Sequence, residues 1–406
     1  MKLAIVTAYP PSKVTLNEYA YHLVKNFRTK EQVEELILLT DVTPEKKDIE
    51  FTEQGCKVTV KECWKFNGYA NIINVTKAIN KTKPDAILFN LQFMKFGDKK
   101  IAAALGLMLP LICKIKKIPT IVLLHNILEQ VDLESAGFTT NKIAQKVYNF
   151  IGTTLTKLLL KADIVAVTMH KYVTTLEKKY NVSNVKMIPH GTFEIPSKPT
   201  HTLPEGSYKI MTFGKFGTYK KVEVMIEAVE KVRKKTKLDI EIVIAGTDNP
   251  NVPGYLKKVQ NQYKHVPQLT FTGYVEENQV ANLFNQSTAV VFPYTSTTGS
   301  SGVLHQAGSY GKAVIMPNLG DLTTLIEDEG YRGEFFEPEN TVSLANAIEK
   351  IITNQEYRIA LEKANYKAAT AFSMDKVTDI YMSYFDAIIN NKEIVSKQLN
   401  PQVIQQ

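Results

Sequence analysis

Two loops of the chain contain residue types that could bind a phosphate group. The first loop has the sequence PYTSTTGSSG over residues 293–302, between an apolar run at 288–292 and a segment whose apolar residues recur with helical spacing. A strand, a loop rich in glycine and hydroxyl groups, and a helix start together direct backbone N–H groups and a helix dipole toward an anion. We expect the phosphate to be bound just before the helix, by Gly299, Ser300, Ser301 and Gly302.

The second loop follows an apolar run at 209–213 and carries two lysines near two glycines. Gly214 and Gly217 allow tight passage of the backbone, and Lys215 and Lys220 can project from the end of the strand. Two cations that face a helix start would hold a diphosphate. In isolation this loop would be interpreted as a surface turn with solvated lysines, but its occurrence in the same half of the chain as the first loop favours a diphosphate site.

The first half of the chain offers candidates at the ends of two strand-like runs. Tyr9, Pro10 and Ser12 directly follow the first apolar run, where a loop for a phosphate or an acceptor would lie. This loop lacks G-x-G-x-x-G, which argues against a dinucleotide site. His125 follows the apolar run 121–124, and a ligand role and a buried, hydrogen-bonded structural role fit it equally well.

Several other chemistries lack their sequence signals. The chain contains no D-x-D pair and no G-x-S-x-G, Walker or H-E-x-x-H motif, so we expect no metal, and in particular no metal–diphosphate bridge. The acidic cluster 327–329 is expected on a solvated helix end. Three cysteines without a C-x-x-C pair argue against a disulfide framework or a zinc site and fit a reducing compartment.

Strand-like and helix-like segments alternate along almost the whole chain, which predicts mostly parallel sheets covered by helices on both faces. A chain of 406 residues exceeds what one core comfortably fills, so two domains are expected. Residues 195–208 break the alternation with three prolines and a glycine and are predicted to form a linker. We therefore predict an α/β protein with two Rossmann-like, doubly wound domains, at 1–197 and 198–372, that face a central cleft. A further helical segment is predicted at 373–406. Ligands of such folds bind at the carboxyl ends of the strands.

The net charge of +8 suits phosphate-bearing substrates or an anionic membrane as well as a merely solvated surface. No basic segment belongs to a recognisable nucleic-acid module, so no nucleic-acid partner is expected. The chain enters a strand-like run at its first residues, without the pattern of a signal peptide, and its longest uncharged apolar run, 101–113, is too short to span a bilayer. We expect a cytoplasmic protein.

Residues 95–118 allow two interpretations. Six lysines and one aspartate in this segment flank the apolar run 101–113. A helix that lies in the membrane interface, with its apolar face in lipid and its lysines at anionic headgroups, would have this pattern, and the protein would then be peripheral at the inner face of the membrane. A helix buried against the sheet explains the apolar residues equally well.

With these residues in view, the chain resembles glycosyltransferase family 4, a group of retaining enzymes with the GT-B fold that use nucleotide sugars. The resemblance extends over nearly the whole length and is carried by short segments that follow strands. These segments are Tyr9-Pro10-Pro11, Leu124-His125-Asn126, Ile188-Pro189-His190-Gly191, Gly214-Lys215 with Lys220, Phe271–Val275 and Gly311–Ile315.

The resemblance implies transfer of a sugar from a UDP- or GDP-linked donor to a hydroxyl of a glycan or lipid-linked acceptor, as in polysaccharide biosynthesis. It implies retention at the anomeric carbon, with no metal or other cofactor. Lys215 and Lys220 would act catalytically on the leaving diphosphate beside Gly214, and His125 would act on the donor sugar. In the same way, Gly273, Tyr274 and Val275 would meet the nucleobase, and Tyr9, Pro10 and Ser12 the acceptor.

Two positions depart from the family pattern. Where that family carries two glutamates eight positions apart, this chain has Thr298 and Gln306. Gln306 can still hydrogen-bond a ribose hydroxyl, whereas Thr298 replaces the carboxylate expected near the donor sugar. The sequence therefore leaves two alternatives open: a non-catalytic GT-B subunit that binds a nucleotide sugar or glycan and supports a partner enzyme, and a GT-B phosphorylase or epimerase.

Overall fold

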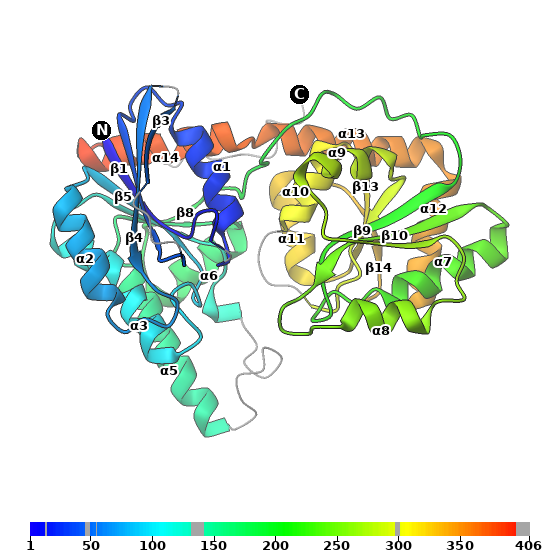
Figure 1. Cartoon of the computed structure of the whole chain (residues 1–406), viewed down its shortest axis with the longest axis horizontal. Helices are drawn as coiled ribbons and strands as arrows, with labels where there is room; N and C mark the ends of the chain where they lie inside the picture. The colour runs from blue at the N-terminus through cyan, green and yellow to red at the C-terminus, as the bar shows by residue number, and fades with distance from the viewer. Residues whose placement is uncertain (13, 45–48, 54, 131–141, 297–300, 395–406) are drawn as a thin grey trace. The chain divides into compact units, whose positions relative to one another are not determined.

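The computed structural model describes residues 1–394 except 13, 45–48, 54, 131–141 and 297–300. The chain forms two compact units, which are described separately (Figure 1). Unit 1 comprises Met1–His190 together with the segment that begins at Met374. Unit 2 comprises Gly191–Ser373.

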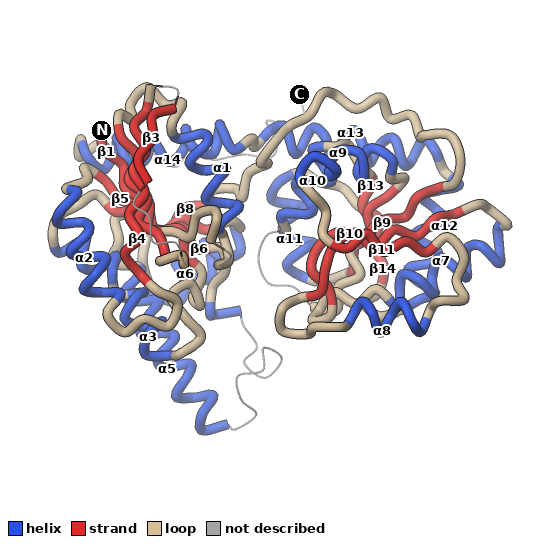
Figure 2. Tube along the Cα trace, in the orientation of Figure 1, coloured by secondary structure: helices blue, strands red, loops and turns tan. Residues whose placement is uncertain are grey.

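The described part of unit 1 contains an eight-stranded sheet with the strand order β3-β4-β2-β1-β5-β6-β7-β8 (Figure 2). Its strands are β1 (Lys2–Val6), β2 (Glu35–Asp41), β3 (Ile49–Glu53), β4 (Cys56–Trp64), β5 (Ala86–Leu91), β6 (Thr120–Leu124), β7 (Ile164–Val167) and β8 (Val185–Met187). Neighbouring strands are parallel except at one edge, where β3 and β4 form an antiparallel pair. Both β5 and β6 are buried along their whole length, which explains why they are continuous apolar runs.

The helices of unit 1 mostly alternate with its strands, as predicted. They are α1 (Asn17–Phe27), α2 (Asn71–Thr82), α3 (Lys100–Leu107), α4 (Leu109–Ile115), α5 (Lys142–Leu159), α6 (His170–Tyr180) and α14 (Met374–Ile389), with a 3-10 turn at Leu128–Gln130. The single helix predicted over 101–113 is instead two helices that meet at Met108. Pro110 lies in the first turn of α4, where its missing N–H has no partner to lose. Among the described helices, none is long and apolar enough to cross a membrane.

Unit 2 contains, within its described residues, a six-stranded parallel sheet with the order β11-β10-β9-β12-β13-β14. The strands are β9 (Tyr208–Phe216), β10 (Ile240–Asp248), β11 (Leu269–Gly273), β12 (Ala289–Val291), β13 (Ala313–Pro317) and β14 (Glu334–Phe336). The helices are α7 (Glu223–Thr236), α8 (Tyr255–Gln262), α9 (Glu277–Gln286), α10 (Gly302–Ser309), α11 (Gly320–Glu329), α12 (Thr341–Thr353) and α13 (Gln355–Ala371).

Helices cover both faces of the unit 2 sheet. Ala313 and Ile315 of β13 belong to an apolar core shared with α7 and α12, which pack against each other. Side chains alternate along a strand, so Val314 and Met316 point to the other face, and α10 and α13 also contact β13. Each unit has a mostly parallel sheet covered by helices. This confirms the fold class predicted from the alternation of strands and helices.

The last described helix, α14, packs against α1 within unit 1. The rings of Phe27 and Tyr381 lie 6.1 Å apart between their centroids, and both side chains are buried. Just after α1, the ammonium of Lys30 lies 2.7 Å from a carboxylate oxygen of Asp375 and 2.7 Å from one of Asp379. Unit 1 is therefore completed by residues from both ends of the chain.

Candidate functional site

The two predicted phosphate loops are joined by hydrogen bonds at the carboxyl edge of the unit 2 sheet. They follow β9 and β12, which are neighbouring parallel strands. Beyond the strand ends, Lys220 and Tyr294 form a short antiparallel bridge. The Lys221 N–H donates to the carbonyl of Pro293 at 3.0 Å, and the Thr295 N–H donates to the carbonyl of Tyr219 at 2.8 Å. Residues more than 70 positions apart are thus held side by side, because the strands that precede them are paired.

Lys220 is the cation that this arrangement positions. Its Nζ lies 4.7 Å from the ring centroid of Tyr294 and 5.8 Å from that of Tyr219. Burial lowers the pKa of Lys220, and the nearby Tyr219 opposes the shift. Within the described part of the chain, no side-chain or backbone acceptor is hydrogen-bonded to this ammonium. The ring faces hold it by cation–π attraction and leave its three N–H donors available.

Gly214 makes room for this lysine. A Cβ atom added to Gly214 would lie 2.9 Å from the Lys220 Nζ, and the glycine has a φ of +139°, which side-chain-bearing residues rarely adopt. The adjacent β10 approaches equally closely, since a Cβ at Gly246 would lie 1.9 Å from the Gly214 carbonyl oxygen. Lys215 lies within β9 opposite Thr247, with an exposed side chain, so it is not enclosed as Lys220 is.

The start of α10 lies at the same edge of the sheet. Ser301 is the residue before the helix, is buried, and its side chain hydrogen-bonds the hydroxyl of Tyr294, the residue whose ring packs on Lys220. Gly302 begins the helix, and Gln306 lies one turn further along, half-buried. The predicted donor-sugar residue Thr298 and the predicted phosphate ligands Gly299 and Ser300 lie outside the described residues.

The predicted nucleobase segment also lies at the carboxyl edge of this sheet. Gly273 ends β11 with a φ of +68°, and Tyr274 follows with 72% of its side chain exposed. Val275 comes next, before α9 begins at Glu277. One strand, β10, lies between β11 and β9 in the sheet order, so this segment and Lys220 share an edge of the sheet but do not follow paired strands.

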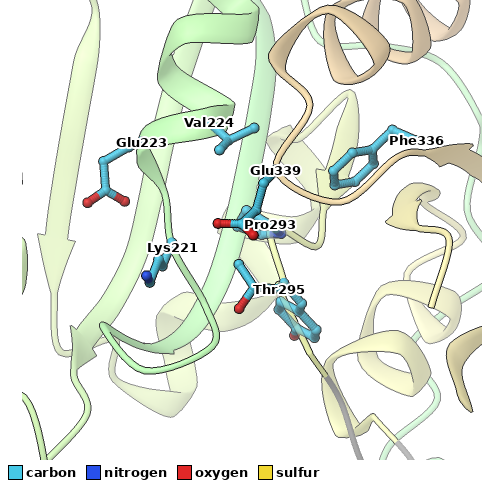
Figure 3. A pocket seen from close by; sticks show the side chains of 8 residues that line it. Lys221, Glu223, Val224, Pro293, Thr295, Phe336 and Glu339 are labelled. Atoms are coloured by element: carbon cyan, nitrogen blue, oxygen red, sulfur yellow. The ribbon is translucent and has the colours of Figure 1, made fainter. Parts of the chain in front are cut away.

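A pocket of about 290 Å³ opens beside the joined loops (Figure 3). Its lining comes from the segments after β9, β12 and β14 and includes both a cation and two carboxylates. The lining residues are Lys221, Glu223, Val224, Pro293, Tyr294, Thr295, Phe336 and Glu339. Lys221 and Glu339 were not predicted from the sequence to belong to a site. Consecutive residues in extended backbone project to opposite sides. The doublet Lys220-Lys221 could therefore have indicated that Lys221 faces a second site, on the other side of the loop from Lys220.

A buried polar cluster connects α10 to the residues at and just after the end of α11. Nδ1 of His305 lies 2.9 Å from the hydroxyl of Tyr331 and 3.3 Å from a carboxylate oxygen of Glu329. Burial raises the pKa of Tyr331, and the charge of Glu329 adds to the shift. The prediction that the 327–329 cluster lies on a solvated helix end is therefore wrong for Glu329, which is fully buried. The close approach of His305 to this carboxylate offsets part of the cost of burying it.

In unit 1, His125 lies at the carboxyl end of β6 in a ring cluster. Its Nε2 is 2.7 Å from the amide oxygen of Asn90, and its ring meets that of Tyr19 edge-on at 4.5 Å. The Tyr19 hydroxyl donates to the backbone carbonyl of His190 at 3.0 Å. Burial, with smaller contributions from His190 and Lys95, lowers the pKa of His125 well below its usual value. His125 is therefore a neutral imidazole whose Nε2 is occupied by Asn90, which leaves Nδ1 as the atom that could meet a ligand.

The first loop of unit 1 is fixed from within. The Ser12 hydroxyl donates to a carboxylate oxygen of Asp41 at 2.6 Å and accepts the Val14 N–H at 3.1 Å. The ammonium of Lys95, which is fully buried, donates to the carbonyl of Thr15 at 2.7 Å. Burial lowers the pKa of Lys95 to about 7 and raises that of Asp41, and each charge partly offsets the shift of the other.

The structure shows the surroundings of four residues of unit 1 that were considered from the sequence. Ser12 was a candidate acceptor contact, and its hydroxyl is engaged by Asp41 and Val14. Tyr9 and Pro10 lie in the same loop and are less buried than Ser12. Lys95 was counted among the lysines flanking an apolar run, but its side chain is inside unit 1 and cannot meet solvent or lipid.

Among the described residues, no group of three or more histidine, cysteine, aspartate or glutamate side chains is arranged to hold a metal ion.

Comparisons with known proteins fit this arrangement. Residues 195–368 match the family model described as Glycosyl transferases group 1. Sucrose-phosphate synthase from Thermosynechococcus elongatus aligns with a TM-score of 0.69 at 15% identity, over 95% of this chain and 100% of that chain. The fold is GT-B.

Other GT-B structures align over similar lengths. HepE from Anabaena, solved in complex with UDP and glucose, has a TM-score of 0.64 at 15% identity over 95% of this chain and 99% of that chain. A structure from E. coli described as trehalose-6-phosphate bound with UDP-2-fluoro glucose has a TM-score of 0.67 at 10% identity over 95% and 99%. No curated protein sequence is matched. At these identities the likeness establishes the fold, and the chemistry must be argued from the residues of this chain.

Proposed function

We propose that this chain is a retaining glycosyltransferase of family 4, which moves a sugar from a nucleotide-diphosphate donor to a hydroxyl group without a metal ion. The proposal rests first on the match of residues 195–368 to group 1 glycosyltransferases. The acceptor would be a glycan or a lipid-linked saccharide, as in polysaccharide biosynthesis, and the reaction would take place in the cytoplasm. UDP-glucose is the first donor to test, because the GT-B neighbours include complexes with UDP-glucose and UDP-2-fluoro glucose.

One observation carries the proposal: Lys220 is held at the carboxyl edge of the sheet with its N–H donors free of protein acceptors among the described residues. Burial lowers the pKa of this ammonium, and an approaching diphosphate would raise it again, because an anion favours the charged form of a lysine. The side chain of Ser301 hydrogen-bonds that of Tyr294, and the first turn of α10, which follows Ser301, would offer backbone N–H groups to the same anion. Lys215 would add a second, solvated cation.

In the proposed reaction, the bond from the anomeric carbon to the diphosphate oxygen breaks, and a bond from that carbon to the acceptor oxygen forms on the same face. The proton of the acceptor hydroxyl passes to the leaving phosphate oxygen. Lys220 stabilises the negative charge that develops on the diphosphate, which is the role a metal ion has in other transferases. His125, neutral and hydrogen-bonded to Asn90, would position the donor sugar through Nδ1.

Replacing Lys220 tests this assignment. Lys220→Ala should lower kcat for transfer from UDP-glucose by about 10²- to 10³-fold, the range found when one stabilising donor of a developing anion is removed. The matched control is Lys234→Ala, which removes an exposed lysine on α7. Isothermal titration with UDP, together with turnover measured by product chromatography, separates binding from chemistry. Unchanged turnover and unchanged UDP affinity in Lys220→Ala would remove the diphosphate role.

A non-catalytic nucleotide-sugar-binding subunit is the second candidate. It is favoured by the replacement of both expected carboxylates by Thr298 and Gln306, which removes charge from the positions near the donor sugar and ribose. UDP-sugar binding that depends on Lys220, without transfer or hydrolysis of any common nucleotide sugar, would support it. Orthophosphate-dependent turnover or sugar interconversion without an acceptor would instead indicate a phosphorylase or an epimerase.

A further inference from the structure

The outward side of α3 and α4 is apolar although it is not buried. Every residue from Ile101 to Cys113 is uncharged, and the inner positions of the two helices are packed in the core. Residues that recur every three or four positions remain half-buried or exposed. They form what we call the apolar stripe: Ile101, Leu105, Met108, Ile112 and Ile115. Surface helices of soluble proteins normally carry polar residues on this side, so the stripe calls for a covering partner.

The ends of the stripe project furthest into solvent. Ile101 is 66% exposed and Ile115 is 71% exposed. Helix α5 lies beside α3 and contacts both α3 and α4, and it adds Phe150, which is 73% exposed (Figure 1). These are three of the most exposed large apolar side chains in the described part of the chain, and all three lie on one layer of packed helices.

Positive charge surrounds these apolar side chains. Residues 99–117 and 142–161 together contain nine lysines and no acidic residue, in a chain with 41 acidic residues. Exposed lysines lie at both ends of the stripe and along α5. They are Lys99, Lys100, Lys114, Lys116, Lys117, Lys146, Lys157 and Lys161. Lys114 pairs with Asp163, a residue just outside the second segment. Lys95, which is buried, is excluded from this surface.

We propose that α3, α4 and α5 form a docking surface for an anionic lipid membrane. The protruding isoleucines and phenylalanine would enter the boundary between headgroups and acyl chains, and the lysines would meet anionic headgroups. The proposal goes beyond glycosyl transfer and does not depend on it, since it concerns a surface of unit 1 alone. Within unit 1, burial is observed for the inner face of the run 101–113, and the proposed membrane contact concerns only its outer face, which is not packed.

Charge decides between a membrane and other partners. In a symmetric pair of chains, a surface meets its own copy, so the lysines around the stripe would face lysines. A nucleic acid would satisfy the lysines but would leave the aliphatic stripe uncovered. An anionic bilayer offers both a negatively charged surface and an apolar layer within reach of the same side chains.

Sedimentation with lipid vesicles tests the surface. The full chain is expected to bind vesicles of phosphatidylcholine with about one third phosphatidylglycerol, and to bind pure phosphatidylcholine at least about tenfold more weakly. Lys116→Glu/Lys157→Glu should weaken binding to the anionic vesicles by at least about tenfold, since each lysine near a charged surface contributes about a factor of five or more. Ile115→Ser should weaken binding to both vesicle types.

Matched variants in unit 2 control for charge and apolarity. Lys234→Glu/Lys257→Glu makes the same change in net charge on exposed lysines, and Val342→Ser removes an exposed apolar side chain. Both should bind anionic vesicles like the unaltered chain, and circular dichroism and melting curves establish that each variant is folded. Absence of binding to anionic vesicles, or equal loss in the unit 2 controls, would overturn the proposal. So would light scattering that shows a dimer abolished by Ile115→Ser, because the stripe would then be covered by a second copy.

Discussion

Lys95 and Lys220 lie in different units but in comparable places, each beyond the carboxyl end of a parallel strand and each removed from most water. Lys95 donates to the carbonyl of Thr15 and lies near the carboxylate of Asp41, so its charge is compensated inside unit 1. Lys220 faces the rings of Tyr219 and Tyr294, which attract a cation without accepting a conventional hydrogen bond.

Hydrogen-bond partners distinguish a structural buried charge from one suited to a ligand. A lysine that donates to a backbone carbonyl and lies near a buried carboxylate has a structural role, because an anionic ligand would have to displace the carbonyl and would be repelled by the carboxylate. A lysine that is desolvated but held only by ring faces keeps its donors for an incoming anion. Burial and a lowered pKa are common to both, so the hydrogen-bond partners are the criterion.

Removing the charge of Lys95 should have the largest effect on stability. At pH 6, where Lys95 still carries its charge, Lys95→Met leaves the buried carboxylate of Asp41 without its neighbouring cation and should lower the free energy of unfolding by about 3–5 kcal/mol. The sole tryptophan of the chain, Trp64, is buried 5.8 Å from the Lys95 Nζ, so urea unfolding followed by its fluorescence reports on unit 1.

Two companion variants sharpen that result. Lys95→Met/Asp41→Asn should recover part of the loss, since neither charge is then left alone. Lys220→Met should leave the Trp64 transition unchanged, because its lysine compensates no buried carboxylate. Equal destabilisation by Lys95→Met and Lys220→Met would erase the contrast between the two lysines.

The backbone beneath Lys220 should be the next most sensitive feature. Gly246 has a φ of +136°, and a Cβ there would lie 1.9 Å from the carbonyl oxygen of Gly214. Gly246→Ala should therefore force β9 and β10 apart and destabilise unit 2 by roughly 2–4 kcal/mol. Gly254→Ala is the control: it also has a positive φ but nothing within 4 Å, and should lose only about 1 kcal/mol.

Circular dichroism melts of the two glycine variants measure this difference. UDP affinity should also fall in Gly246→Ala, because Gly214 lies against the Lys220 ammonium. Similar losses in the two variants would mean that backbone strain alone, and not the close approach of β10 to Gly214, governs the site.

The pKa of Lys95 predicts a gradual dependence of stability on pH. Its value in the folded protein is about 7, below the 10.5 of an unfolded chain, so between these values the unfolded state binds more protons. Stability should therefore rise with pH across this window, by up to about 1.4 kcal/mol per pH unit. Urea titrations from pH 7 to 9.5 measure the free energy of unfolding at each pH. If it rises equally steeply with pH in the unaltered chain and in Lys95→Met, Lys95 is not the group responsible.

The sequence predicted the fold correctly wherever a local pattern of residues determines a position in three dimensions. Strands such as β5 and β6 are buried on both faces, so they are visible as apolar runs, and the residues that follow them must meet at one edge. For this reason Gly214, Lys220 and Ser301 could be brought together from the sequence. The edge strand β3 was missed because its sequence, Ile49-Glu-Phe-Thr-Glu53, is half polar and is stabilised by its antiparallel partner.

Buried charges were the main failure of sequence reasoning. Lys95 and Glu329 have the composition of solvated residues, and only partners distant in the sequence make their burial tolerable. Asp41 is 54 positions from Lys95, and His305 is 24 positions from Glu329, so no local pattern connects them. The break between α3 and α4 was missed for a related reason, since a proline in the first turn of a helix can be recognised only once the helix start is known.

The pairing of α14 with α1 has a consequence for synthesis. Unit 1 is completed by a helix that begins at Met374, after all of Gly191–Ser373 has been made. At roughly 5–20 residues per second, the ribosome needs on the order of 10–40 s to make that intervening segment. During this interval the face of α1 that carries Phe27 is without its partner Tyr381. A nascent chain stalled before Met374 should therefore expose an apolar site to which a chaperone can bind. This site is covered once the last helix has been made.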